Sequence, residues 1–397
     1  MGASGTSAVG QVGEIVARAV AGRLPAVGCG GIPWRGVGWA GTVRGMGGMD
    51  GVLERLDAQL GELSEQRDLS GAVLITRAGG TEFERCYGLA NRSDAVPVRP
   101  GTRFGLASLT KMFTAVAVAD LVRQGRLDFD TPVVKILPAR RRPATLLPEV
   151  TVHHLLTHTS GIADYFEEEG NEDGDYAELW TDRPSYRVLR PADFLPLFAD
   201  IPPYRAPGGR FQYSNAGYIL LGLVIEELAE APYTEVVTDR VFGPAGMGAS
   251  GFFALDEARP DVAVGYLRPR GPGAPWRSNI YSIPPVGGPD GGAFSNAADL
   301  DRFLHAYDDG TLLGRQLRDV MLTPRCDVQD GLAMGYGVYL YAEGRTRRFG
   351  HGGRDPGYEV LIQRLPELDV NAIVLCNVED LAGQVRDLLV EAVVATA

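Results

Sequence analysis

The fold of this chain is decided by the stretch Gly105-Leu-Ala-Ser108-Leu-Thr-Lys111-Met-Phe-Thr-Ala-Val-Ala-Val-Ala-Asp-Leu-Val122. It predicts a turn that enters an apolar helix. Residues three apart lie on one face of a helix, so we expect the Ser108 hydroxyl to meet the Lys111 amine at the start of that helix. The helix macrodipole favours developing negative charge at this end. The spacing therefore predicts a serine nucleophile activated by a neighbouring base.

Lysine is rare in this chain, which makes Lys111 informative. Thirty-six of the 38 basic residues are arginine, and the only other lysine is Lys135. Arginine cannot lose its proton near neutral pH, whereas a desolvated lysine can, so position 111 suits a base. A single Ser-x-x-Lys also has an ordinary explanation, in which the serine caps a helix and the lysine extends along the surface. Further motifs have to decide between the two.

A second motif is Tyr213-Ser-Asn215, in a polar loop that opens onto an amphipathic helix expected over about 216–231. A tyrosine hydroxyl can transfer a proton if a neighbouring cation lowers its pKa, and asparagine offers both donors and acceptors to a substrate amide. Taken alone, this pattern is typical of a helix-capping loop.

A third motif is Phe349-Gly-His351-Gly-Gly353-Arg354, between two strand-like runs. Glycine in a strand lets a ligand or another backbone approach closely. A backbone N–H at such an edge can complete an oxyanion hole. Taken alone, a glycine-rich hairpin turn explains the same residues.

In this order, the three motifs resemble the serine β-lactamase and penicillin-binding-protein superfamily. The resemblance is to its class-C-like branch, with family VIII esterase and D-aminopeptidase-type relatives. Two further stretches support it, His154-Leu-Leu-Thr-His158-Thr-Ser-Gly161 and Gly291-Gly-Ala-Phe-Ser295-Asn-Ala-Ala-Asp299. The resemblance spans about Met49 to Ala397.

The resemblance implies a role for each motif residue. Ser108 would attack a carbonyl and become acylated, while Lys111 and Tyr213 would move its proton to the leaving group. Asn215 would hold the acyl side of the substrate. The backbone N–H groups of Ser108 and Arg354, beside Gly353, would form the oxyanion hole.

The third motif departs from the penicillin-binding pattern, in which Lys-Thr-Gly or His-Thr-Gly is common. Gly352 replaces the hydroxyl, and His351 is expected to be mostly neutral near pH 7. Both changes reduce the expected affinity for a β-lactam or D-Ala carboxylate, although an inward-turned Arg354 side chain would compensate. We therefore expect a serine hydrolase of the esterase or D-peptidase type that forms an acyl-enzyme on an ester or amide. The alternatives are an acyltransferase that passes the acyl group to an amine or alcohol, and a non-catalytic ligand-binding relative.

The expected fold class is α+β, with an antiparallel sheet flanked by helices and built from both chain ends, plus a mostly helical inserted domain. This arrangement is β-lactamase/transpeptidase-like, as the resemblance implies. The sheet domain would comprise residues 49–130 and 320–397, and the helical domain residues 131–319. The expected helices cover 51–66 and 378–394, and the expected strands 72–76, 82–87, 335–341, 346–350, 359–365 and 370–376.

Composition narrows the function classes. A net charge of −12 argues against a general nucleic-acid or anionic-membrane binder, so the expected partner is a small-molecule ester or amide. The four cysteines are scattered, which favours reduced thiols and a cytoplasmic protein. His154 and His158 have helical metal-ligand spacing without an obvious third ligand, and we expect neither a metal nor a cofactor. The oligomeric state is not predicted.

Two segments stand apart from the motifs. Residues 1–48 contain fourteen glycines and one acidic residue, without a continuous apolar run. We expect a disordered or mis-annotated N-terminal extension. Residues 164–180 are acidic with interspersed aromatics, which is typical of a solvated surface insertion. Alternatively, this segment lies over the mouth of the site, where its charge favours a substrate with an amine.

Overall fold

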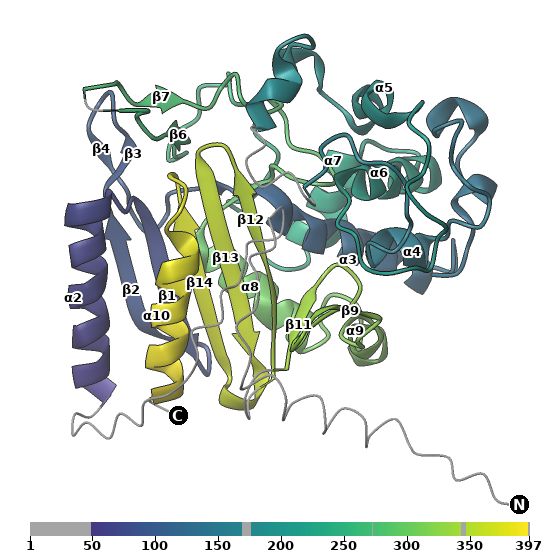
Figure 1. Cartoon of the computed structure of the whole chain (residues 1–397). Helices are drawn as coiled ribbons and strands as arrows, with labels where there is room; N and C mark the ends of the chain where they lie inside the picture. Colours follow the sequence, from purple (N-terminus) through teal and green to yellow (C-terminus); the bar gives the residue numbers. More distant parts are fainter. Residues whose placement is uncertain (1–48, 169–175, 272, 343–346, 396–397) are drawn as a thin grey trace, which may run out of the picture.

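The computed structural model describes residues 49–168, 176–271, 273–342 and 347–395. An eight-stranded antiparallel sheet with strand order β2-β1-β14-β13-β12-β11-β10-β9 lies beside a mostly helical part (Figure 1). The strands are β1 (Gly71–Arg77), β2 (Gly80–Tyr87), β9 (Cys326–Gln329), β10 (Leu332–Met334), β11 (Tyr339–Tyr341), β12 (Arg348–Asp355), β13 (Tyr358–Leu365) and β14 (Val370–Cys376). The expected α+β fold class is confirmed.

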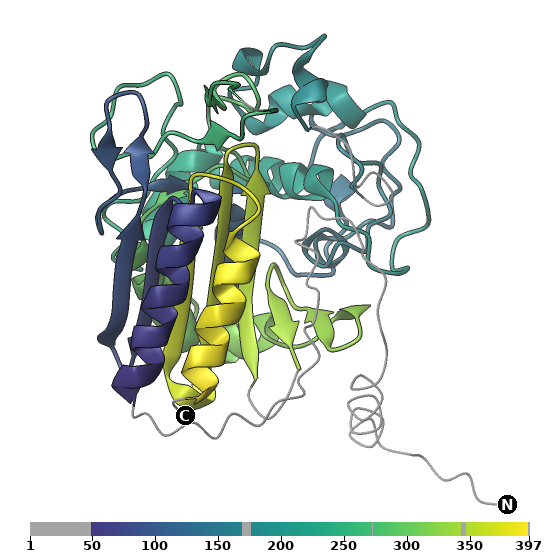
Figure 2. The same cartoon turned by 60° about the vertical axis from the view of Figure 1, so that its left-hand side comes forward.

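Strands from the two ends of the described chain lie side by side in this sheet, next to its β2 edge. β1 pairs with β14 in a register that runs from Gly71 opposite Cys376 to Arg77 opposite Val370. Helices α2 (Met49–Arg67) and α10 (Ala382–Ala395) pack side by side on one face (Figure 2). Helix α8 (Ala297–Asp308) covers the other face against β1 and β14. The sheet thus supports the turn that precedes α3 (Thr110–Arg123), because β12 contacts this turn.

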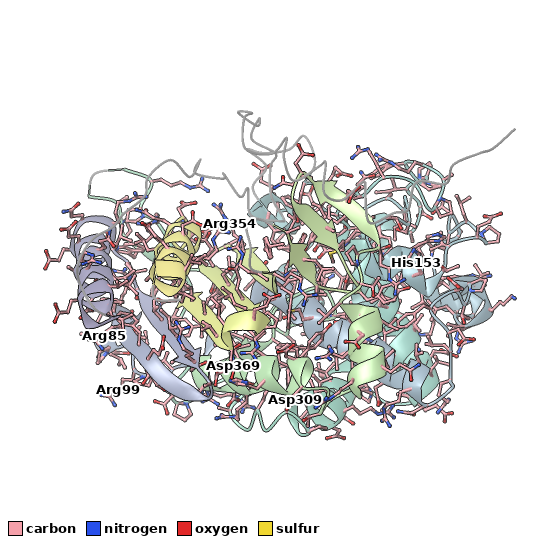
Figure 3. The ribbon with its side chains drawn as sticks, turned by 90° about the horizontal axis from the view of Figure 1, so that it is seen from below. Arg85, Arg99, His153, Asp309, Arg354 and Asp369 are labelled. Carbon is pink, nitrogen blue, oxygen red and sulfur yellow. The ribbon has the colours of Figure 1, made fainter. Side chains whose placement is uncertain are left out.

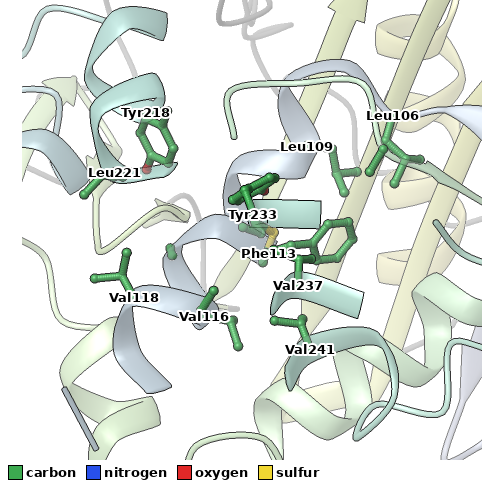
Figure 4. Close-up of a cluster of buried hydrophobic side chains, with 14 of the residues drawn as sticks. Leu106, Leu109, Phe113, Val116, Val118, Tyr218, Leu221, Tyr233, Val237 and Val241 are labelled. Atoms are coloured by element: carbon green, nitrogen blue, oxygen red, sulfur yellow. The ribbon is translucent and has the colours of Figure 1, made fainter. Parts of the chain in front are cut away.

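The centre of the helical part is α3, which is buried on nearly all sides. A helix that is hydrophobic all round is expected to lie inside the protein. Phe113 makes edge-to-face contacts with Phe242 and Phe303 at centroid distances of 5.0 and 4.8 Å. Figure 4 shows Phe113 among Leu109 and the side chains of α7 (Tyr233–Val237). This packing fixes the first turn of α3, where Lys111 lies.

The other helices of this part are α4 (Val152–Leu156), α5 (Leu195–Phe198), α6 (Asn215–Ala229) and α9 (Arg315–Met321). α6 packs against α3 and α4, and its bounds agree with the helix expected over 216–231. The first helix and the first hairpin also lie where the sequence predicts them. Within the described ranges, no helix is both long and apolar enough to cross a membrane.

Several elements near the C-terminal end differ from the predictions. The predicted strand 335–341 is only Tyr339–Tyr341, because Gly337 has φ +70° and its α-carbon turns against Ala115 of α3. The strands β9 and β10 before it were not predicted. The last helix begins at Ala382 and not at 378. At this start, the Glu359 carboxylate accepts the N–H groups of Leu381 and Ala382.

The third motif lies inside a strand, not between two strands. β12 continues through His351 to Asp355, and β11 pairs with it only from Arg348 to Gly350. The far edge of β12 beyond Gly350 is therefore left to the turn that carries Ser108, which packs against it.

Candidate active site

Ser108 lies in a tight turn held between two strands and a helix. Strand β5 (Phe104–Gly105) leads into the 3₁₀ turn η1 (Ala107–Leu109), which continues directly into α3. Ala107 has φ +46°, an unusual conformation for a residue with a side chain. A Cβ atom on Gly353 would lie 2.8 Å from the Ser108 backbone nitrogen, so β12 and the turn are in direct contact. The Ser108 residue is only 8% exposed.

Lys111 is fully buried beneath Ser108. Its Nζ donates to Ser108 Oγ at 3.0 Å, to Asn215 Oδ1 at 2.8 Å and to the Asp290 carbonyl. Burial lowers the pKa of Lys111, although nearby carboxylates, led by Asp290 and Glu168, oppose this shift. The first two motifs therefore meet at one ammonium group, which lies 104 residues from Asn215 along the chain.

Tyr213 lies above the same ammonium group. Its ring centroid is 4.9 Å from Lys111 Nζ. The Tyr213 hydroxyl is buried without a hydrogen-bond partner among the described residues, and burial raises its pKa well above the ordinary value. The nearby Ser108 hydroxyl lowers the Tyr213 pKa, against the effect of burial. The two hydroxyls nevertheless make no hydrogen bond of normal geometry. The Tyr213 hydroxyl is thus placed near Ser108 and is available to a third group.

His158 holds Tyr213 in place. The two rings stack with centroids 4.5 Å apart, and His158 Nδ1 accepts the Ser214 N–H at 3.0 Å. Burial lowers the pKa of His158 well below its ordinary value, so the ring is neutral. Sequence reasoning treated His158 as part of a supporting stretch and as one half of a metal-like pair, and did not foresee this positioning contact.

Asn215 begins α6 and is fixed through all its polar groups. Its backbone N–H donates to Asp164 Oδ2 at 2.6 Å, and its Nδ2 donates to Glu168 Oε1 at 3.1 Å. Asp164 also accepts the Ala216 N–H, so this carboxylate caps the helix. Burial raises the pKa of Asp164 to about 7 despite these donors. Asp164, at the start of the acidic 164–180 segment, is therefore buried in the site and not part of a solvated surface.

His351 is buried in β12 and uncharged. Burial lowers its pKa to about 3. Its Nδ1 lies 2.5 Å from the Gly352 carbonyl, which can only accept, so Nδ1 carries the proton. Its Nε2 is then an acceptor, and it has no partner within the part of the chain that is described. The position offers a lone pair to a ligand and no positive charge.

Arg354 points away from Ser108. Its guanidinium pairs with Asp380 at 2.7 Å and with Glu379 at 3.4 Å, near the start of α10 (Figure 3). The inward-turned side chain that would compensate for a neutral His351 is therefore not present. Only the backbone of Arg354 remains beside the turn that carries Ser108, next to Gly353.

Comparison with known proteins identifies the family. A family model described as Beta-lactamase matches residues 53–395. The chain belongs to the beta-lactamase family. This confirms the resemblance inferred from the three motifs.

Relatives of this beta-lactamase-family chain include an esterase and penicillin-binding proteins. Esterase EstB of Burkholderia gladioli is 36% identical over 279 residues, which are 64% of this chain and 70% of EstB. Penicillin-binding protein 4* of Bacillus subtilis is 27% identical over 338 residues, 80% of this chain and 70% of that protein. The crystal structure of a penicillin-binding protein from Bacillus halodurans matches with a TM-score of 0.77 and 38% identity, covering 84% of this chain and 99% of that one.

Other histidines of this beta-lactamase-family chain have structural contacts. His154 completes the capping box of α4 with Thr151, and His153 Nδ1 lies 2.9 Å from the Tyr336 hydroxyl. Figure 3 shows His153 far from Arg354. Over the described ranges, no three histidine, cysteine or acidic side chains lie together as a metal site would require.

The site also holds carboxylates that sequence reasoning did not assign to it. Glu168, Asp290 and Asp355 all act on the pKa of Lys111, and they come from three distant parts of the chain. Burial raises the pKa of Glu168 to about 8 and that of Asp355 to about 7. Asp290 accepts a hydrogen bond from Tyr165. Glu168 belongs to the acidic segment 164–180. Asp290 and Asp355 are each a single acid in a glycine- and proline-rich stretch, and no spacing rule marks them.

Proposed function

We propose that this chain is a serine hydrolase that forms an acyl-enzyme at Ser108 on an ester or amide. The observation that carries this proposal is the buried Lys111 Nζ, which bridges Ser108 Oγ and Asn215 Oδ1. A lysine with a lowered pKa beside a hydroxyl is the arrangement of an activated nucleophile. An esterase and penicillin-binding proteins among the relatives agree with this class of reaction.

The proposed reaction follows from the geometry of the site. Neutral Lys111 takes the Ser108 proton as Oγ attacks the carbonyl carbon, and the backbone N–H groups of Ser108 and Arg354 receive the oxyanion. The proton then passes by way of the Tyr213 hydroxyl to the leaving group, which departs as the acyl-enzyme forms. Water attacks the acyl-enzyme by the same route in reverse and releases the acid.

The substrate class follows from the third motif. His351 is neutral and Gly352 has no hydroxyl, so this edge of the site has no cation for a substrate carboxylate. The Arg354 guanidinium does not supply one, because it pairs with Asp380 and Glu379. We therefore propose esters and amides without a carboxylate at this edge as substrates. β-Lactams would then be poor acylating agents.

The experiment that tests this function is intact-protein mass spectrometry with p-nitrophenyl acetate and with a fluorophosphonate. We expect an adduct on the wild type and on the surface control Ser93→Ala, and none on Ser108→Ala. An adduct that persists on Ser108→Ala would contradict the assigned nucleophile. Absence of an adduct on every protein would favour the non-catalytic ligand-binding alternative.

Acyl transfer shares the same first half-reaction. Product analysis in the presence of an added amine or alcohol separates the two outcomes. Free acid as the main product supports hydrolysis, whereas an amide or new ester as the main product supports the acyltransferase alternative.

A further inference from the structure

His158 has a backbone conformation that is uncommon for a residue with a side chain. Its φ is +57°, in the left-handed region. It follows the end of α4, where such a conformation is normally taken by glycine or asparagine. A turn that only had to end the helix would not need an imidazole, and this imidazole is buried. The contacts of His158 therefore indicate why histidine stands at this position.

Two hydrogen bonds join His158 to the residues on either side of Tyr213. The His158 carbonyl accepts the Gln212 N–H at 2.8 Å, and His158 Nδ1 accepts the Ser214 N–H at 3.0 Å. Because Nδ1 accepts, the proton of the neutral ring lies on Nε2. His158 thus fixes the backbone both before and after the tyrosine.

The imidazole also holds the tyrosine ring itself. It stacks on Tyr213 with an interplanar angle of 27° and a centroid distance of 4.5 Å, and it contacts the Tyr218 ring at 5.0 Å. Lys111 Nζ lies 4.9 Å from the centroid of Tyr213 and 5.5 Å from that of Tyr218. Stacked aromatic rings at such distances stabilise one another. The three rings therefore form one cluster beside the ammonium group.

The Tyr213 hydroxyl has no anchor of its own. It makes no hydrogen bond of normal geometry within the ranges that the structure describes, whereas the Tyr218 hydroxyl donates to the Leu156 carbonyl at 3.1 Å. The direction of the Tyr213 hydroxyl therefore depends on the backbone and the ring of this residue, and His158 contacts both. A misplacement of about 1 Å in a reacting group lowers a rate by about 100-fold.

We propose that His158 is a positioning residue that aligns the Tyr213 hydroxyl with the leaving group of the substrate. It forms no covalent bond and transfers no proton in this role. The inference rests on the proposed function, in which the Ser108 proton reaches the leaving group by way of Tyr213. It adds to the site a residue that acts only through its contacts with another side chain.

The test compares two esters that need this proton to different extents. p-Nitrophenolate leaves without a proton, whereas the p-nitrobenzyl alkoxide must be protonated as it leaves. p-Nitrophenyl acetate and p-nitrobenzyl acetate differ by one CH₂ group and form the same acyl-enzyme, so their kcat/KM values compare acylation. The readout is the ratio of these two values, in which a general loss of folded enzyme cancels.

Two variants separate the two kinds of contact. His158→Asn keeps an oxygen that can accept a hydrogen bond and tolerates a positive φ, but it removes the ring. His158→Phe keeps a ring and removes the acceptor. We expect each variant to lower kcat/KM for p-nitrobenzyl acetate by about tenfold or more beyond its effect on p-nitrophenyl acetate, a part of the roughly 100-fold that a proton-transferring group contributes.

Two further variants complete the comparison. His153→Asn is the matched control, because His153 is a half-buried histidine that contacts a different tyrosine, Tyr336, and it should keep the wild-type ratio. Tyr213→Phe removes the hydroxyl and should change the ratio at least as much as the His158 variants do. In the Tyr213→Phe background, His158→Asn should then leave the ratio unchanged, because residues that act through one group are not additive.

Three outcomes would overturn the inference. They are a wild-type ratio in both His158 variants, a wild-type ratio in Tyr213→Phe, and a further change of the ratio when His158→Asn is added to Tyr213→Phe. A changed ratio in only one His158 variant supports the inference and identifies the ring or the acceptor as the contact that matters. If p-nitrophenyl acetate acetylates Ser108 in these proteins, as intact-protein mass spectrometry would show, the proposed function stands and only the positioning role fails. If no ester acylates Ser108, the proposed function itself fails.

Discussion

At the scale of single residues, the site depends on a lysine that is kept out of water. Lys111 is fully buried, and its Nζ contacts Ser108, Asn215 and a backbone carbonyl. Its surroundings of four carboxylates stabilise the ammonium form, whereas burial favours the amine and has the larger effect on the pKa. In the proposed mechanism Lys111 accepts the Ser108 proton, which an arginine in the same place could not do.

Lys111→Arg is therefore expected to lower kcat/KM for p-nitrophenyl acetate by at least about two orders of magnitude. The variant keeps the positive charge and removes the titratable base. Lys135→Arg is the matched control, because Lys135 is the other lysine of the chain and is exposed. Turnover of Lys111→Arg close to that of the wild type would exclude Lys111 as the base.

The residues that sequence reasoning could place are those tied together by local geometry. Ser108 and Lys111 are three apart on one turn, and their 3.0 Å contact follows from helix spacing alone. His351 was expected to be mostly neutral because of its ordinary pKa, and burial in β12 lowers that pKa further, to about 3. Asp290 and Asp355 could not be foreseen, because only the tertiary fold brings them to Lys111.

At the scale of elements, β12 and the turn η1 act as one unit. Gly353 allows the strand to touch the turn, because a Cβ atom there would lie 2.2 Å from the Leu106 carbonyl oxygen and 2.8 Å from the Ser108 nitrogen. Both neighbours are backbone atoms, so a side chain can fit only if the strand or the turn moves. The two components of the proposed oxyanion hole lie on either side of this contact.

Gly353→Ala should consequently lower kcat/KM by about 100-fold or more, the usual effect of displacing reacting groups by about 1 Å. The free energy of unfolding should fall by about 1–3 kcal/mol, as for other overpacked sites. Gly61→Ala in α2 is the control, because no atom lies within 4 Å of its potential Cβ and alanine favours a helix. Urea unfolding and ester kinetics measure both effects, and wild-type kinetics in Gly353→Ala would refute the close contact.

Sequence reasoning worked for elements that carry a long periodic pattern. The helices α2 and α6 and the strands β1, β2, β13 and β14 lie within a few residues of their predicted ranges. The strands β9 and β10 were missed because they are only four and three residues long, too short for a periodic pattern, and they pair only with each other and β11. Residues 335–338 are not part of the strand predicted over 335–341, because Gly337 packs against α3 in the folded chain.

At the scale of the whole molecule, the buried carboxylates come together from separate regions. Asp164 and Glu168 belong to the helical part, Asp290 to the loop before α8, and Asp355 to the sheet. The site is thus formed only when both parts of the chain are folded against each other. Its charge makes the stability of the whole fold depend on pH.

The sign of this dependence follows from the pKa values. The folded protein raises the pKa of Asp164 and Asp355 from 3.8 to about 7 and that of Glu168 from 4.5 to about 8. At a pH between the unfolded and the folded pKa values, the folded chain binds more protons at these three carboxylates than the unfolded chain does. Their contribution to stability is therefore fully present below about pH 4 and is lost as the pH rises through 7 to 8, by about 1.4 kcal/mol per pH unit for each proton.

Glu168→Gln isolates one of these protons, because glutamine keeps an oxygen that can accept the Asn215 Nδ2–H and does not titrate. We expect the free energy of unfolding of the wild type, measured by urea titration from pH 5.5 to 8.5, to fall more steeply with pH than that of the variant. The difference in slope should approach about 1.4 kcal/mol per pH unit between pH 5.5 and 7.5. Since the other ionisable groups titrate in both proteins, parallel curves would mean that Glu168 is already ionised in the folded state. In that case the negative charge beside Lys111 at neutral pH would be larger than the raised pKa of Glu168 implies, and it would favour the ammonium form of Lys111 more strongly.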